Sequence, residues 1–140
     1  MKTVCLALCI CALVSASAVA EDKKDAPPAG ASAAAGTVVT PAEVAKLIAE
    51  KKATILDIRT PEEFAEGHIP DAVNIDYMSD DFARKIAALD KTKTYVVHCG
   101  AGSRSTKSLP ALEQAGLKSV LHLQQGFKGW QSAGQPIEKP

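Results

Sequence analysis

The sequence has no excess charge of either sign. Its 140 residues include 16 lysines and arginines and 16 aspartates and glutamates, so the formal net charge is zero. Aromatic residues are scarce, at 4%, and no block of basic residues is interleaved with them. Proteins that bind nucleic acids usually concentrate positive charge on one face or along one helix. We therefore expect no nucleic-acid partner.

A hydrophobic run long enough to cross a bilayer is also lacking. The N-terminal apolar run extends from Val4 to Val14, which is about 11 residues, whereas a spanning helix needs about 20. Residues 1–20 carry one early lysine and end in Ala-Val-Ala, the pattern of a secretory signal peptide. An uncleaved membrane anchor is the alternative. We predict cleavage after Ala20, no stable membrane insertion, and a periplasmic or secreted mature protein.

Cysteine becomes rarer still once this segment is removed. Three of the four cysteines, Cys5, Cys9 and Cys11, lie in the predicted signal peptide, which leaves Cys99 alone. A single cysteine cannot form an internal disulfide, so it is a reactive thiol, an intermolecular partner or an inert buried residue. Export compartments are generally oxidising, and a free thiol there is a liability unless it has a function.

The remaining chain divides into a linker and one domain. Residues 21–36 contain charges followed by Pro, Ala, Gly and Ser without periodicity, which is typical of a flexible linker. Residues 37–140 have the length of a single domain, which we expect to act as a monomer.

Helices and strands are predicted to alternate along this domain. Thr-Pro-x-Glu occurs at Thr40 and again at Thr60, and each copy has the N-cap, N1 proline and N3 glutamate of a helix start. Such alternation predicts an α/β fold with a parallel sheet, whose ligands bind at the carboxyl ends of the strands. The predicted strands are 53–58, 94–98 and 119–123, with 72–75 a further candidate, and further helices are expected over 80–89, over 103–115 and as a final turn after 125.

Cys99 stands where a predicted strand passes into a loop of small residues, His98-Cys-Gly-Ala-Gly-Ser-Arg-Ser105. Backbone N–H groups of such a loop can converge on one point, and the following helix adds the positive end of its dipole. Lowering a cysteine pKa from about 8.5 to about 7 takes roughly 2 kcal/mol, whereas a helix dipole usually provides about 0.3–1 kcal/mol. N–H donors and Arg104 must therefore contribute if Cys99 is a thiolate.

Three segments resemble the rhodanese (sulfurtransferase) superfamily in its single-domain form: residues 57–75, 96–105 and 123–137. The resemblance implies a central five-stranded parallel sheet flanked by helices. It also implies that Cys99 is catalytic and carries sulfane sulfur as a persulfide, without a cofactor or metal. The partners would be a small sulfur donor, of which thiosulfate is the one expected, and a thiophilic acceptor such as cyanide or a protein thiol. Residues of the loop that would bind the substrate are Gly100, Ala101, Gly102, Ser103 and Arg104.

The length of the loop bears on the chemistry. Phosphatases and arsenate reductases of the same fold have five residues between cysteine and arginine, which would require arginine at position 105. Here four residues separate Cys99 from Arg104, and Ser105 follows. The shorter loop fits one terminal sulfur atom better than a tetrahedral oxyanion. The sequence therefore favours sulfur transfer, with a non-catalytic or sulfur-carrying rhodanese module as the alternative and an oxyanion enzyme as the third hypothesis.

Four residues are expected to support the loop. Asp57 and Arg59 end the first predicted strand, and the resemblance implies that they brace the loop beside the site. We expect an ion pair between Arg59 and Glu63 on the next helix. Ser105, which directly follows the loop, completes this group.

The remaining distinctive residues are expected to have structural roles. Strand alternation points His98 away from the site, His122 lacks metal-ligand spacing, and Trp130 is expected in the core. Asp71 is expected to adopt a left-handed conformation, and Pro110 is expected to kink or interrupt the helix after the loop.

Overall fold

The computed structural model of the chain describes residues 36–140. The predicted signal peptide, 1–20, and all of the predicted linker except Gly36 lie outside the described residues. The backbone N–H of Gly36 donates to the carbonyl of Val120 at 2.9 Å, so Gly36 already joins the folded domain.

A five-stranded parallel sheet forms the centre of the domain, which confirms the predicted fold class. The strands follow the order β1-β5-β4-β2-β3, and every neighbouring pair is parallel. The central strand, β4, therefore pairs with strands from both halves of the chain. The strands are β1 (Thr37–Val38), β2 (Thr54–Asp57), β3 (Val73–Asn74), β4 (Tyr95–His98) and β5 (Val120–His122).

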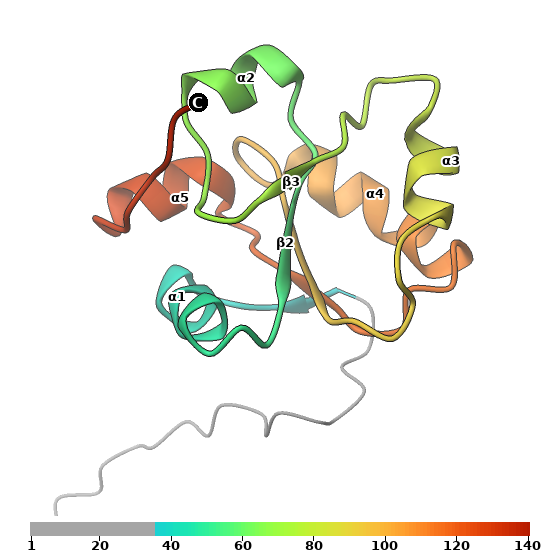
Figure 1. Cartoon of the computed structure of the whole chain (residues 1–140), viewed down its shortest axis with the longest axis horizontal. Helices are drawn as coiled ribbons and strands as arrows, with labels where there is room; N and C mark the ends of the chain where they lie inside the picture. Colours follow the sequence, from blue (N-terminus) through green and yellow to red (C-terminus); the bar gives the residue numbers. More distant parts are fainter. Residues whose placement is uncertain (1–35) are drawn as a thin grey trace, which may run out of the picture.

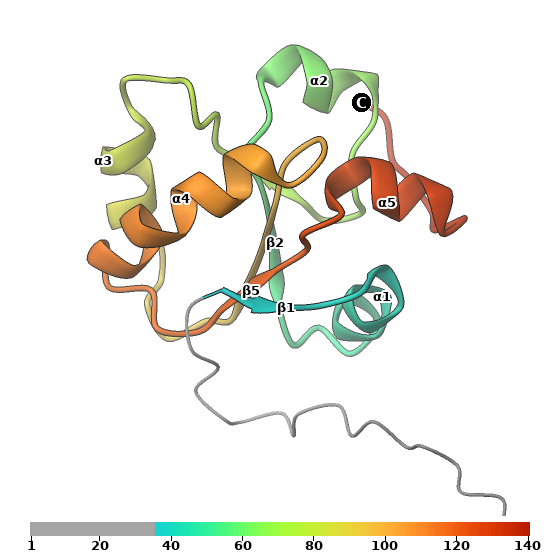
Figure 2. The same cartoon turned by 180° about the vertical axis from the view of Figure 1, so that it is seen from behind.

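Helices cover both faces of the sheet (Figures 1 and 2). They are α1 (Pro41–Ala49), α2 (Pro61–Glu66), α3 (Phe82–Ala87), α4 (Ser103–Gln114) and α5 (Gly126–Ser132). α1 and α5 contribute to one hydrophobic core, and α3 and α4 contribute to the other. α2 directly follows β2 and lies at the carboxyl edge of the sheet, where the site was expected (Figure 1).

Alternation along the strands divides the buried side chains between these two cores. Ile55, Val96 and Leu121 pack toward α1 and α5. Their neighbours Leu56 and Val97 pack toward α3 and α4. Successive side chains of a strand point to opposite faces, and a sheet covered on both faces therefore needs continuous apolar strands.

Both predicted capping boxes are present. The side chain of Thr40 accepts from the backbone N–H of Glu43, and the carboxylate of Glu43 accepts from the N–H of Thr40. Thr60 and Glu63 make the same reciprocal pair at the start of α2. Each box satisfies two N–H groups that lack partners within the helix.

Several elements differ in extent from the prediction. β1 was not predicted from the residue pattern, and the expected final turn is the complete helix α5. α4 continues through Pro110, so the expected interruption does not occur. Asp71 has φ of 58°, which confirms its left-handed conformation. Trp130 is 1% exposed and donates from Nε1 to the carbonyl of Pro136, which confirms its place in the core.

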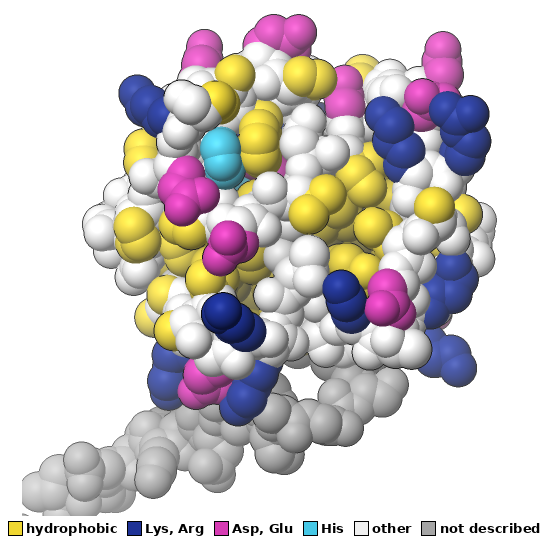
Figure 3. Space-filling view, viewed as in Figure 1, with side chains coloured by type: hydrophobic (Ala, Val, Ile, Leu, Met, Phe, Trp, Pro, Cys, Tyr) yellow, Lys and Arg dark blue, Asp and Glu magenta, His cyan; other side chains and the backbone are white. Residues whose placement is uncertain are grey.

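The surface mixes charges of both signs. On the face shown in Figure 3, positive and negative side chains are interspersed around exposed hydrophobic ones. The large hydrophobic residues most exposed to solvent are Val38, Val73, Met78 and Ile137. Within residues 36–140, no helix combines the length and apolar character needed to cross a membrane.

Candidate active site

Cys99 directly follows the central strand β4. The last residue of β4, His98, pairs with Asp57 of β2 at the carboxyl edge of the sheet. Cys99 is a free thiol and is 1% exposed. The topology therefore places the cysteine at the edge where parallel α/β sheets bind ligands.

Hydrogen-bond donors converge on the sulfur of Cys99. The N–H of Gly102 lies 3.1 Å from Sγ and the hydroxyl of Ser105 lies 3.6 Å from it. Burial raises the pKa of the Cys99 thiol and is the largest single effect. Hydrogen bonds from the backbone and hydroxyl of Ser105 and from the backbone of Ala101 and Gly102 outweigh burial, so the pKa is lowered. Donors that favour the thiolate thus exceed the cost of burying its charge.

Ser105 also connects the cysteine to β5. Its Oγ lies 2.9 Å from the carbonyl oxygen of Gly102 and 2.9 Å from Nε2 of His122. Burial lowers the pKa of His122, so this ring favours the neutral form. This contact was not predictable from the sequence, because residues 17 positions apart meet only through the pairing of β4 with β5.

Arg104 forms its ion pair with Glu63. Nη1 and Nη2 of Arg104 lie 2.7 and 2.8 Å from the two carboxylate oxygens of Glu63. A hydrogen bond from Arg104 lowers the pKa of Glu63 to about 2. Glu63, and to a smaller extent Cys99, raises the pKa of Arg104.

The expected ion pair between Arg59 and Glu63 is therefore wrong. Arg59 instead pairs with Asp57, with Nη2 2.6 Å from Oδ2, and both side chains are buried. Arg59 also donates to the backbone carbonyls of Glu63 and Gly67, and its guanidinium stacks 4.0 Å from the centre of the Phe127 ring. A buried charge requires such complete pairing, and this network joins β2 to both ends of α2.

The N-terminus of α5 fixes the loop from the other side. The N–H of Phe127 donates to the carbonyl of Cys99 at 2.7 Å, and the N–H of Lys128 donates to that of Gly100 at 3.0 Å. Gly102 has φ of 96°, and a Cβ on it would collide with the carbonyl oxygen of Gln124. A Cβ on Gly126 would lie 2.6 Å from the carbonyl oxygen of Cys99. Glycine is thus required at both positions.

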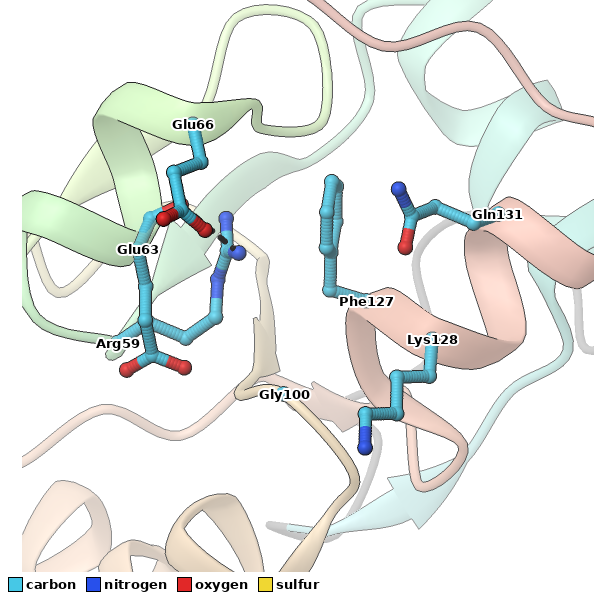
Figure 4. Close-up of a pocket in the computed structure, with 7 residues that line it drawn as sticks. All are labelled: Arg59, Glu63, Glu66, Gly100, Phe127, Lys128 and Gln131. Carbon is cyan, nitrogen blue, oxygen red and sulfur yellow. Dashed lines mark hydrogen bonds between the residues drawn. The ribbon is translucent and has the colours of Figure 1, made fainter.

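A cavity of about 260 Å³ adjoins the loop between α2 and α5 (Figure 4). Its walls contain the predicted residues Arg59, Glu63 and Gly100, together with Glu66, Phe127, Lys128 and Gln131. The last four were not predicted, although three of them belong to the C-terminal segment that resembled the rhodanese superfamily. The predicted loop residues Ala101 and Ser103 are exposed, and Ser103 begins α4.

His98 is fully buried and lies away from the cavity walls. Its Nε2 is 3.6 Å from Oδ2 of Asp57 and has no hydrogen-bond partner. Burial lowers the pKa of His98, although Asp57 opposes this effect. The packing role expected for His98 agrees with this position. Among residues 36–140, no group of three or more His, Cys, Asp or Glu side chains is arranged to hold a metal ion.

Comparison with known proteins identifies this architecture. The model of the rhodanese-like domain family matches residues 40–133. The chain belongs to this family. A rhodanese-related protein of Thermoplasma volcanium has a TM-score of 0.67 and 29% sequence identity, over 74% of this chain and 99% of that one. The C-x4-R loop after β4 is thus the loop of a rhodanese-like domain.

Curated relatives connect the domain to sulfurtransferases. A sulfurtransferase of Allochromatium vinosum is 35% identical over 86 residues, which cover 61% of this chain and 78% of that protein. Thiosulfate sulfurtransferase 16 of Arabidopsis thaliana is 33% identical over 93 residues, covering 59% and 78% respectively. Some relatives are much longer: the match covers 27% of MoeZ of Mycobacterium tuberculosis. The protein is a rhodanese-like domain related to sulfurtransferases, with Cys99 buried at its site.

Proposed function

We propose that this protein is an exported sulfurtransferase that moves sulfane sulfur from thiosulfate or a similar donor to a thiophilic acceptor. The observation that carries the proposal is the convergence of Gly102 N–H and the Ser105 hydroxyl on the sulfur of Cys99. The name of the Arabidopsis relative supports thiosulfate as the donor. Export rests on residues 1–20 alone, and the mature protein from its native host is expected to begin at Glu21.

The chemistry proceeds by double displacement. The Cys99 thiolate attacks the outer sulfur of thiosulfate, the sulfur–sulfur bond of the donor breaks, and sulfite leaves with the bonding electrons. Cys99 then carries a persulfide, whose terminal sulfur takes the place of the thiolate among the loop donors. A cyanide ion or an acceptor thiolate attacks this terminal sulfur, forming thiocyanate or a new persulfide and restoring the Cys99 thiolate.

Loop donors serve both halves of this cycle. They favour the thiolate before the reaction, and they stabilise the negative charge on the terminal sulfur of the persulfide afterwards. Arg104 supplies the positive charge that an anionic donor requires, because it lies in the first turn of α4, directly after the loop. The four-residue spacing between Cys99 and Arg104 matches transfer of a single sulfur atom better than attack on an oxyanion.

Mass spectrometry and turnover together test the proposal. After incubation with thiosulfate, intact protein is expected to gain the mass of one sulfur atom, and cyanide is expected to remove it with release of thiocyanate. Cys99→Ser should abolish both. If no Cys99-dependent persulfide forms, the proposal is wrong. If the persulfide forms but is delivered stoichiometrically to one partner protein without turnover, the protein is a sulfur carrier rather than a free-standing enzyme.

A further inference from the structure

The carboxylate of Glu63 pairs with Arg104, the cation that an anionic sulfur donor would need. Its two oxygens engage both terminal nitrogens of Arg104, which is the bidentate geometry by which arginine also recognises oxyanions. Among residues 36–140, Glu63 is the one carboxylate that forms an ion pair with Arg104. The arginine is therefore already occupied by an anion that belongs to the protein.

This ion pair also lies against the candidate active-site loop. A Cβ built on Gly100 would be 3.3 Å from Nη2 of Arg104 and 3.5 Å from Oε1 of Glu63. Beneath the loop, Cys99 is 1% exposed. The walls of the adjoining cavity include Glu63 but not Arg104 (Figure 4). An anion that enters the cavity thus encounters the carboxylate before it can reach the guanidinium.

We propose that Glu63 is a specificity-determining residue: its carboxylate is an internal competitor for Arg104, so an anionic donor reaches Cys99 only by displacing it, while an uncharged reagent does not compete for this position. This inference rests on the proposed function for the identity of the donor. The competition itself is a property of the ion pair and applies to any small anion that approaches Cys99.

The structural role of Glu63 can be separated from this competition. Oε2 of Glu63 also accepts from the N–H of Thr60 in the capping box of α2. Glutamine serves equally well as the third helical residue of a capping box, so Glu63→Gln preserves the cap and removes the charge. Glu66 provides a matched control, because it lies on the same helix and lines the same cavity but has no contact with Arg104.

Alkylation of Cys99 by two reagents measures the competition without requiring sulfur transfer. Iodoacetate is an anion and iodoacetamide is neutral, and both are attacked by the Cys99 thiolate with loss of iodide. The rate constants are measured by mass spectrometry on the peptide that contains Cys99, using the full chain. Glu63→Gln is expected to raise the ratio of the iodoacetate rate to the iodoacetamide rate about three- to fivefold, the range for losing a partly exposed ion pair.

Glu66→Gln removes a charge of the same sign from the same cavity. It is expected to change this ratio by less than about half of the change that Glu63→Gln causes. If the two variants change the ratio equally, or if Glu63→Gln leaves it unchanged, Glu63 does not compete for Arg104. The iodoacetamide rate of each variant is the control for folding, because loss of the folded loop would change both rate constants and not their ratio alone. The KM for thiosulfate is expected to fall in Glu63→Gln in parallel.

The two proposals fail in different ways. A shifted alkylation ratio without sulfur transfer supports the role of Glu63 and contradicts the sulfurtransferase function. Normal transfer with an unchanged ratio contradicts the role of Glu63 alone.

Discussion

The hydroxyl of Ser105 has one proton and three neighbours that can accept it. They are the sulfur of Cys99, the carbonyl oxygen of Gly102 and Nε2 of His122. If Nε2 of His122 carries a proton, it donates to Oγ, and the Ser105 proton is then free for the sulfur or the carbonyl. The tautomer of a residue on β5 therefore influences how well the thiolate is solvated by the protein.

Ser105→Ala removes this donor and is expected to raise the pKa of Cys99. A hydrogen bond to an ion contributes roughly 1 kcal/mol or more, and 1.36 kcal/mol corresponds to one pKa unit. We expect the midpoint of the pH dependence of iodoacetamide alkylation to rise by about half a unit to one unit. Ser108→Ala is the matched control, because Ser108 is also buried on α4 but donates to the carbonyl of Ser105 rather than to sulfur. Equal midpoints for both variants would contradict this role of Ser105.

At the scale of elements, the site depends on three chain segments that meet at the loop. β4 delivers Cys99, α4 begins directly after Gly102, and the first turn of α5 binds the carbonyls of Cys99 and Gly100. The closeness of these segments explains why glycine is required at Gly102 in the loop and at Gly126, the first residue of α5.

Gly102→Ala is expected to destabilise the domain by about 2–5 kcal/mol, since a left-handed residue costs roughly 1–2 kcal/mol and overpacking adds about 1–3 kcal/mol. Gly134→Ala isolates the first of these effects, because Gly134 also has a positive φ, 67°, but nothing lies within 4 Å of its added Cβ. Urea denaturation of both variants gives the comparison. A loss of stability in Gly102→Ala no larger than that in Gly134→Ala would show that the loop moves away from Gln124 at no cost.

At the scale of the whole molecule, buried histidines couple stability to pH. Burial lowers the pKa of His98 and of His122 below the ordinary value of 6.5. Asp57 attracts a proton to His98 and Arg59 repels it, but burial prevails. The unfolded chain binds these protons more readily than the folded one. The stability that the neutral histidines contribute is therefore fully present above pH 6.5 and is lost as the pH falls below this value.

Urea denaturation at pH values between about 5 and 8 measures this effect. The free energy of unfolding is expected to decrease on acidification below pH 6.5. His98→Leu should flatten the decrease, whatever its effect on stability at neutral pH. Glu63 adds little to the pH dependence of unfolding in this range, because its pKa is lowered to about 2. A slope that is the same in both proteins would indicate that His98 is not kept neutral by the fold.

Local signals predicted much of this architecture, whereas long-range pairing was not predictable. The two capping boxes located the starts of α1 and α2 to the residue, because each signal is complete within four residues. β1 contains only two residues, too few for a periodic pattern. The predicted partner of Glu63 was Arg59, which is only four residues away. The observed partner, Arg104, is 41 residues away and becomes a neighbour only when β2 and β4 pair.

The contacts of α5 with the loop make the arrangement of donors around Cys99 depend on a helix formed late in the chain. The donors that hold the carbonyls of Cys99 and Gly100 come from Phe127 and Lys128, which are synthesised after every strand of the sheet. Until that helix docks, the carbonyls of Cys99 and Gly100 lack these partners, and the loop is not held in the shape that directs its N–H groups at the sulfur. We therefore expect the pKa of Cys99 to lie nearer its ordinary value in a partly folded chain than in the folded domain.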